Sequence, residues 1–103
     1  MENIFNNLPD DLSEEVIENL LVTKELRIER IISRGHRSPD NFWYDQDTNE
    51  FVILLSGCAD IEFESEEMVK LEPGGWLVIP AHKKHRVNKT AENENSVWLT
   101  VHY

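Results

Sequence analysis

Apolar residues in this chain occur in short runs that stop at glycine, proline or asparagine. One run, residues 51–55, ends at Ser56 and Gly57, and another, residues 76–79, lies between a glycine pair and Pro80. Short runs punctuated in this way are typical of the strands of an all-β sandwich or barrel. The strands expected after the first quarter of the chain are residues 27–33, 42–46, 50–55, 58–64, 68–71, 76–79, 85–89 and 96–103.

Residues 10–22 fit two different secondary structures. Asp11 and Glu14 have the spacing of a helix-capping box. Apolar residues recur at helical spacing, at Leu12, Val16, Ile17, Leu20 and Leu21. An early strand over residues 15–21 is the alternative, and the local pattern leaves both open.

Residues 27–33 alternate as a strand that carries charge on both faces. Arg27 and Glu29 share one face, whereas Ile28 and Arg30 share the other. At most one of the two arginines can therefore point toward an interior. In that position it would hold an anionic substrate, and the competing interpretation is a solvated strand edge.

Length and charge restrict the class of protein. A chain of 103 residues is expected to form a single domain over residues 1–103, large enough for a core of its own. The formal net charge of −10 argues against nucleic acid and anionic membrane surfaces as partners, because binding there requires positive charge. No apolar run approaches the ~18–20 residues that span a bilayer.

Cysteine content and the N-terminus both favour a cytoplasmic protein. Cys58 is the single cysteine, so an internal disulfide is excluded, and a partly buried structural thiol is expected. The first residues lack the basic region and the long apolar segment of a signal peptide.

The spacing of glycine, proline and histidine in the second half of the chain is distinctive. Five residues separate Gly74 from Pro80, and His85 follows Pro80 after four more. A second histidine, His82, lies three residues before His85. Two imidazoles at this spacing beyond a strand can reach one site if the intervening turn curls inward.

A matching pattern occurs upstream, where six residues separate Glu50 from Gly57. Together the two stretches resemble the two signature motifs of the cupins, which are small metal-binding β-barrels. His85 matches the metal-binding histidine of the second motif, and Glu50 matches the glutamate of the first. The chain departs from the family where His82 replaces a glycine and Lys89 replaces an asparagine.

The His-x-His of the first cupin motif is absent from this chain. With a three-residue spacer before the glutamate its places fall on Tyr44 and Gln46, and with a four-residue spacer on Trp43 and Asp45. The three-residue spacer is preferred here. Strand alternation then points Tyr44 and Gln46 to the same side and Asp45 away from it.

The resemblance covers residues 26–103 and implies a double-stranded β-helix, the jelly-roll barrel of cupins, with a short N-terminal extension. It is closest to small single-domain bacterial cupins of the conserved-barrel cupin 2 type. It also favours the strand over residues 15–21, preceded by a helical turn. Cupins commonly pair through outer strands and swapped termini, so the resemblance implies a homodimer.

The resemblance further implies a metal pocket between the two sheets, with Gln46, Glu50, His82 and His85 as metal ligands. A set of imidazole, carboxylate and carboxamide donors suits a divalent transition metal such as Zn²⁺, Fe²⁺, Mn²⁺, Ni²⁺ or Co²⁺. Tyr44 is the candidate catalytic residue, as a hydrogen-bond donor or proton shuttle. His102 is expected in packing or in a dimer contact. The aromatic residues expected mostly in the core are Phe42, Tyr44, Trp76 and Trp98.

Two classes of function stay open at this point. One is a small metal-dependent enzyme, a dioxygenase or an isomerase, that acts on a small polar molecule. The other is a non-catalytic module that binds or senses a small molecule or a metal. The missing His-x-His favours the second class more than a complete motif would, and it makes analogy with any particular cupin enzyme unsafe.

Overall fold

The computed structural model describes residues 1–65 and 67–103, which form strands and loops without a helix. The strands are β1 (Val16–Val22), β2 (Arg27–Ser33), β3 (Glu50–Ser56), β4 (Ala59–Phe63), β5 (Met68–Leu71), β6 (Trp76–Ile79), β7 (His85–Thr90) and β8 (Ser96–His102). The described residues thus offer no helix that could span a membrane. The all-β prediction is confirmed, as are most of the predicted strand positions.

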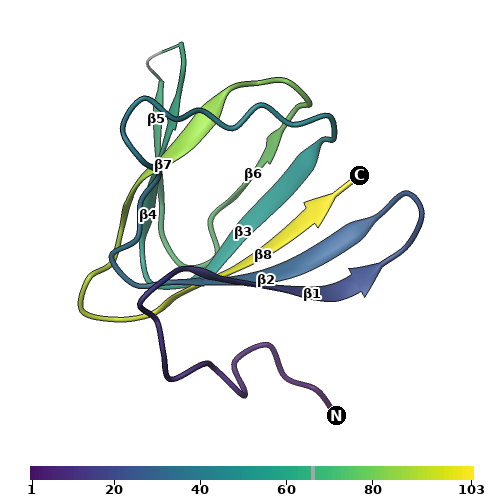
Figure 1. Ribbon diagram of the computed structural model, residues 1–103, viewed down its shortest axis with the longest axis vertical. Coiled ribbons are helices and arrows are strands. Elements are labelled where there is room, and N and C mark those ends of the chain that lie inside the picture. Colours follow the sequence, from purple (N-terminus) through teal and green to yellow (C-terminus); the bar gives the residue numbers. More distant parts are fainter. Residues whose placement is uncertain (66) are drawn as a thin grey trace.

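The strands form two antiparallel sheets (Figure 1). One has five strands in the order β1-β2-β8-β3-β6, and the other has three in the order β5-β4-β7. Strands far apart in sequence become neighbours, because β8 lies between β2 and β3. This is the jelly-roll arrangement that the resemblance to the cupin motifs implied.

The core forms where apolar side chains from both sheets meet. Val52 and Leu54 of β3 and Trp98 of β8 belong to one buried cluster with Ile61 and Phe63 of β4. Burying a side chain of this kind contributes about 1.5–3 kcal/mol relative to leaving it exposed. This apolar contact joins the two sheets without a disulfide bond.

The pairing of strands places a row of ionisable residues across the inner face of the five-stranded sheet. Arg27 lies opposite His102, and His102 lies opposite Glu50. In the next inward-facing row, Glu29 lies opposite Thr100. The inner face is therefore polar at the end where β2 and β3 begin, and it becomes apolar further along the strands.

The outer face of the same sheet carries an apolar row that crosses all five strands. The row runs Leu21, Ile28, Val101, Phe51, Val78, each residue lying opposite the next. Leu21 and Val78, at its two ends, are almost half exposed, at 48% and 45%. Ile28, Phe51 and Val101, between them, are partly buried. An apolar row that is partly open to water across a whole sheet is a candidate contact surface.

Arg30 holds the N-terminal extension against the sheet. Its guanidinium donates to the backbone carbonyls of Ile4, Asn6 and Asn7 at 3.1, 2.6 and 3.2 Å. It also donates twice to the carboxylate of Glu18, at 2.9 and 2.8 Å. The extension accordingly runs beside β1 and β2 (Figure 1).

The prediction of a strand over residues 42–46 is wrong. The segment meets the free edge of β7 through one isolated bridge, in which Tyr44 and His85 exchange backbone hydrogen bonds of 2.7 and 3.2 Å. Asn41 adopts a φ of 62°, which interrupts any regular ladder just before this bridge. The chain therefore follows β7 irregularly, as a loop.

The helical turn expected before β1 is also wrong, whereas the early strand is confirmed. Residues 10–15 are turns and irregular backbone, and β1 begins at Val16. The pairing of β1 with β2 shifts between Asn19 and Leu21. This irregularity in an edge strand breaks strict alternation, which explains why the apolar positions mimic helical spacing.

Three predictions of burial are wrong. Cys58 is exposed, because it lies in the turn before β4. Phe42 lies in the exposed loop, and Trp76 points outward from β6 and stacks on Phe51 with ring centroids 5.5 Å apart. Trp98, in contrast, is buried as predicted.

Candidate functional site

A cavity of about 190 Å³ lies between the two sheets. Its lining includes four of the residues singled out from the sequence, Tyr44, Gln46, Glu50 and His85. Ile61 and other apolar core residues form the rest of the wall. This volume lies below the range of ~300–1,000 Å³ that holds drug-sized ligands, so the occupant must be small.

Glu50 and His85 face each other across this cavity from different sheets. Glu50 is the first residue of β3 and His85 is the first of β7, and both side chains are about nine-tenths buried. Glu50 Oε1 lies 3.8 Å from His85 Nε2, which is too far for a direct hydrogen bond. A water molecule or a ligand atom can bridge such a separation.

The orientation of the His85 ring is fixed by its other nitrogen. Nδ1 lies 2.9 Å from the backbone oxygen of Lys83, which can only accept, so Nδ1 carries the proton. In the neutral ring, Nε2 therefore presents a lone pair toward Glu50.

Burial shifts the pKa values of both groups toward their neutral forms. It raises the pKa of Glu50 to about 7, helped by the charge of Glu29 and opposed by Arg27. Burial lowers the pKa of His85, although the hydrogen bond to Lys83 opposes the shift. Near neutral pH, Glu50 can therefore give or take a proton, and His85 is a neutral base.

A second polar cluster, which the sequence reasoning did not single out, lines the same cavity. Glu29 Oε1 accepts hydrogen bonds from His102 Nε2 at 3.0 Å and from Thr100 Oγ1 at 3.2 Å. Glu29 Oε2 accepts another from Arg27 Nε at 3.1 Å. The alternation of β2 was the available signal, since it already placed Arg27 and Glu29 on one face.

Arg27 is thus the arginine that faces the cavity, while Arg30 points to the outer face. His102 is buried in the pocket wall, which agrees with packing, the first of the two roles expected for this residue. His102 lies opposite Glu50 because β8 pairs with β3, and the sequence alone does not reveal this pairing.

Tyr44 reaches the site from the loop beside β7. Its ring stacks on that of His85, with centroids 5.5 Å apart and planes at 25°. Burial, with the charges of Glu15 and Glu50, raises the pKa of the Tyr44 hydroxyl, so the hydroxyl stays protonated and can donate a hydrogen bond. Gln46 lines the cavity from the same loop, and its backbone oxygen accepts from His82 N at 2.8 Å.

His82 does not join this group. It has a φ of 65°, is exposed and does not line the cavity. Its Nδ1 lies 2.8 Å from Asp45 Oδ1, and its Nε2 lies 3.7 Å from Asp47. The structure therefore places His82 and Asp45 outside the cavity that Gln46, Glu50 and His85 line. This agrees with the three-residue spacer, which points Asp45 away from the site.

Few side chains in this cavity are arranged to bind a metal ion. Within residues 1–65 and 67–103, no group of three or more histidine, cysteine, aspartate or glutamate side chains is arranged to hold an ion. Glu50 and His85 supply one oxygen and one nitrogen, and Gln46 adds only a neutral carboxamide. Catalytic zinc sites usually have three protein ligands, so this donor set does not fit a tightly held resident ion.

Solved structures of other proteins have the same architecture. A protein from Ralstonia eutropha JMP134, provisionally described as a mannose-6-phosphate isomerase, is 45% identical, with a TM-score of 0.94 over 99% of this chain and 95% of its own. An RmlC-like cupin from Desulfovibrio desulfuricans is 17% identical, with a TM-score of 0.77 over 99% of this chain and 94% of its own. The iron(II) protein HppE is 17% identical, with a TM-score of 0.74 over 94% of this chain and 54% of its own.

No protein-family model and no curated protein matches the chain. The fold, the inward-facing polar pocket and these likenesses define a small single-barrel cupin. The chain belongs to the cupin superfamily.

Proposed function

We propose that this cupin is an isomerase that moves a proton on a small polar molecule bound between Glu50 and His85. The observation that carries the proposal is the placement of these two buried groups, 3.8 Å apart, on opposite walls of one small cavity. An acid and a base this close together can both reach neighbouring atoms of one molecule that lies beside them.

The proton movements follow from the two protonation states. His85 Nε2, with its lone pair, removes a proton from a carbon next to a carbonyl group. Neutral Glu50 donates its proton to the carbonyl oxygen, which gives an enol and leaves a carboxylate beside an imidazolium. His85 then returns its proton to the former carbonyl carbon, while the Glu50 carboxylate takes the proton of the hydroxyl group on the neighbouring carbon. A new carbonyl forms there, and both side chains are restored.

The neighbouring residues keep this pair in position. The hydrogen bond from His85 Nδ1 to Lys83 holds the ring in the tautomer that can act as a base. Stacking of Tyr44 on His85 fixes the plane of the ring, and the Tyr44 hydroxyl is a hydrogen-bond donor to the substrate. The description of the 45% identical Ralstonia protein as an isomerase is consistent with this reaction class.

The metal role predicted for Gln46, Glu50, His82 and His85 has less support than proton transfer. His82 lies outside the cavity lining, and the remaining donors are too few for a tightly held ion. The iron(II) of HppE is a property of that protein, and the likeness to it at 17% identity concerns the fold.

The test is hydrogen exchange catalysed by the protein in deuterated water. A panel of small hydroxy-ketones and aldoses is incubated with the protein, and NMR follows the loss of protons next to the carbonyl group. We expect exchange with at least one compound, and a loss of at least roughly 100-fold in Glu50→Gln and in His85→Asn. Lys84→Gln, at an exposed site, is the matched control and should retain the rate.

Exchange that persists unchanged in both pocket variants would overturn the assignment. Binding of the same compounds without any exchange would instead identify the protein as a non-catalytic small-molecule-binding module.

We further propose that the chain forms a homodimer through its outer apolar row. The row from Leu21 to Val78 carries no charge, although the chain has a net charge of −10. Two copies can bring the same row together about a two-fold axis, since such an interface uses one patch on both subunits. This removes from water the apolar side chains that a monomer leaves exposed.

A further inference from the structure

The two arginines of β2 are held in different ways. On the outer face, Arg30 is almost fully buried, and its terminal nitrogens donate to three backbone carbonyls and to Glu18. On the cavity side, the side chain of Arg27 is 44% exposed, and within the described residues it makes one hydrogen bond, from Nε to Glu29. A guanidinium group has five N–H donors, so both terminal nitrogens of Arg27 can donate to a bound molecule.

The contact with Glu29 positions this guanidinium group. Glu29 Oε2 accepts from Arg27 Nε at 3.1 Å, while Glu29 Oε1 accepts from His102 Nε2 and Thr100 Oγ1 at 3.0 and 3.2 Å. The side chain that holds Arg27 is therefore itself fixed to β8. A guanidinium group held in this way presents its terminal N–H groups in one plane, and a carboxylate can accept two parallel hydrogen bonds from such a plane.

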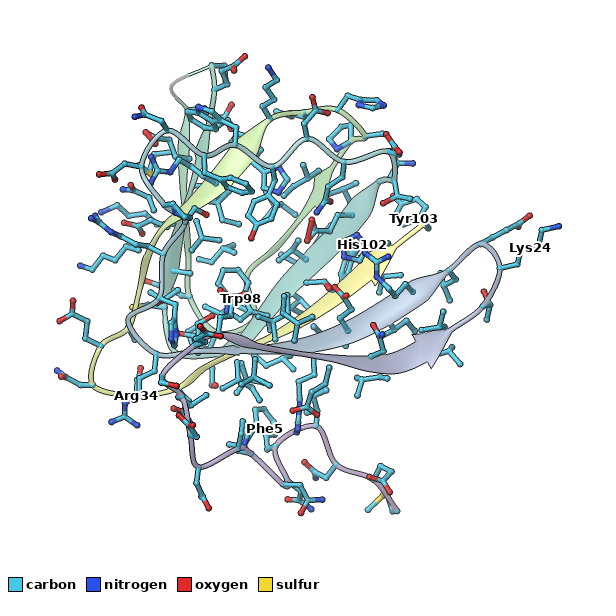
Figure 2. All side chains as sticks on the ribbon, viewed as in Figure 1. Phe5, Lys24, Arg34, Trp98, His102 and Tyr103 are labelled. Atoms are coloured by element: carbon cyan, nitrogen blue, oxygen red, sulfur yellow. The ribbon has the colours of Figure 1, made fainter. Side chains whose placement is uncertain are left out.

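Arg27 lies at the end of the sheet, in the same row as the proposed acid Glu50. Arg27 is opposite His102, and His102 is opposite Glu50, on the neighbouring strands β2, β8 and β3. Facing Cα atoms of antiparallel strands are about 4.5–5.5 Å apart, so roughly 10 Å separates the Cα atoms of Arg27 and Glu50. Figure 2 shows His102 near the C-terminal end of β8, beside Tyr103. A molecule held at Glu50 and His85 therefore reaches Arg27 within a few further atoms.

The positive charge of Arg27 acts on the interior of the pocket. Among the cavity-lining residues in the described part of the chain, Arg27 is the one lysine or arginine, so its charge is permanent. Burial lowers the pKa of His102, and the charge of Arg27 adds to this shift. The pocket therefore has one position at which a negatively charged group of a ligand is favoured.

The other charges of the pocket favour a carboxylate over a phosphate at this position. Glu15, Glu29 and Glu50 also line the cavity, and burial raises the pKa of Glu15 and of Glu50. Arg27 supplies a single positive charge, which it shares with Glu29. A phosphate monoester carries about −1.5 to −2 charges near pH 7, whereas a carboxylate carries one negative charge. The phosphate would therefore bring more uncompensated charge close to these carboxyl groups.

We propose that Arg27 binds a carboxylate group of the ligand, so that the substrate of this pocket is a small hydroxy-carbonyl compound that is also a carboxylic acid. Its carbonyl end lies at Glu50 and His85, and its carboxylate accepts hydrogen bonds from the terminal nitrogens of Arg27. The inference rests on the proposed function for the carbonyl end of the molecule. Of the two interpretations that the pattern of β2 left open, the guanidinium group on the cavity side favours the anion site over the solvated edge.

Binding of small carbonyl compounds measures this recognition without any turnover. The probes are levulinate, which is a keto acid, and 5-hydroxypentan-2-one, in which a hydroxymethyl group replaces the carboxylate of levulinate. D-erythrose 4-phosphate is the phosphate probe. In ¹⁵N-labelled protein, the Nε–H signals of the arginines report the contact, and the signal that disappears in Arg27→Lys belongs to Arg27. We expect a saturable shift of this signal with levulinate, at a dissociation constant at least roughly tenfold lower than that of the neutral ketone.

Arg27→Gln and Arg37→Gln form a matched pair of variants, because each removes one positive charge. Arg37 is exposed and does not line the cavity, so Arg37→Gln should bind the probes like the parent. Arg27→Gln should weaken binding of levulinate roughly 10- to 100-fold, since charge-assisted hydrogen bonds are lost. It should bind the neutral ketone unchanged, which verifies that the pocket is intact. Arg27→Lys should recover part of the affinity, because it keeps the charge and loses the planar donors.

Three outcomes would overturn the inference. Levulinate could bind no more tightly than the neutral ketone, D-erythrose 4-phosphate could bind more tightly than levulinate, or Arg27→Gln could affect levulinate and the neutral ketone equally. Carboxylate binding at Arg27 combined with no hydrogen exchange would refute only the proposed reaction. Exchange with neutral hydroxy-ketones combined with no binding of levulinate would refute only the carboxylate site.

Discussion

At the scale of single residues, burial determines the chemistry of the pocket, because it favours the neutral forms of Glu50 and His85. The resemblance to the cupin motifs predicted that Glu50 and His85 belong to the site, because a motif records which positions along the chain converge. It could not reveal Glu29 and His102, since their place in the pocket depends on which strands are neighbours. It also included His82, whose side chain turns away because the backbone there is left-handed.

The first prediction concerns the protonation of Glu50. Its folded pKa of about 7 lies above the ordinary value of 4.5, so the unfolded chain releases this proton first as the pH rises. The contribution of Glu50 to the free energy of unfolding therefore falls between about pH 4.5 and pH 7, by up to about 3 kcal/mol. Glu50→Gln, which removes the charge, should become progressively more stable than the parent over this range.

Urea unfolding of both proteins at about pH 5 and about pH 8 measures this difference. His85 and His102 have pKa values lowered by burial, so their contributions rise with pH, but they are present in both proteins. A stability difference that stays constant with pH would show that Glu50 titrates normally.

The second prediction concerns metal content. Because no three histidine, cysteine, aspartate or glutamate side chains converge on one point in the described residues, protein purified without an affinity tag should carry far less than one transition-metal ion per chain. Elemental analysis of the protein gives this number directly. A content near one ion per chain that disappears in both Glu50→Ala and His85→Ala would establish the metal role instead.

At the scale of elements, glycine turns hold the strands in register. Most strands could be predicted because their ends are marked by glycine or proline, which act locally. The segment of residues 38–46 could not, since its aromatic residues indicate a strand while its backbone follows the edge of β7 through isolated hydrogen bonds. Whether an edge becomes a regular ladder depends on its partner, which the local sequence does not contain.

The third prediction concerns the turn between β3 and β4. Gly57 has a φ of 82°, and a Cβ there would overlap Ser96, whose hydroxyl bonds both the N–H and the carbonyl of Cys58. Gly57→Ala should lower the free energy of unfolding by about 2–4 kcal/mol. Gly74→Ala is the control, because Gly74 also has a positive φ but open space around it, and it should cost only about 1 kcal/mol.

Urea unfolding of the two alanine variants checks this comparison. Equal losses at Gly57 and Gly74 would mean that backbone conformation alone matters and that the approach of Ser96 does not constrain the turn.

At the scale of the whole molecule, one sheet serves two purposes through its two faces. Strand alternation sends the ionisable residues Arg27, Glu29 and Glu50 inward to the cavity, and it sends Ile28 and Phe51 outward to the apolar row. The pocket and the proposed dimer contact are therefore coupled through the same strands. A shift in pairing by one residue would exchange the two faces and destroy both.

The last prediction tests the outer row. Light scattering after size exclusion should give twice the chain mass of 12.1 kDa for the parent protein, and Val78→Asp should give the monomer mass. Met68→Asp, at an apolar exposed site on the three-stranded sheet, is the control and should remain dimeric. Each chain has a net charge of −10, so the two subunits repel each other. Raising the salt concentration screens this repulsion and should therefore strengthen the dimer. A parent protein that is monomeric at every concentration would contradict the proposal, and a dimer that persists in Val78→Asp but dissociates in Met68→Asp would move the interface to the smaller sheet.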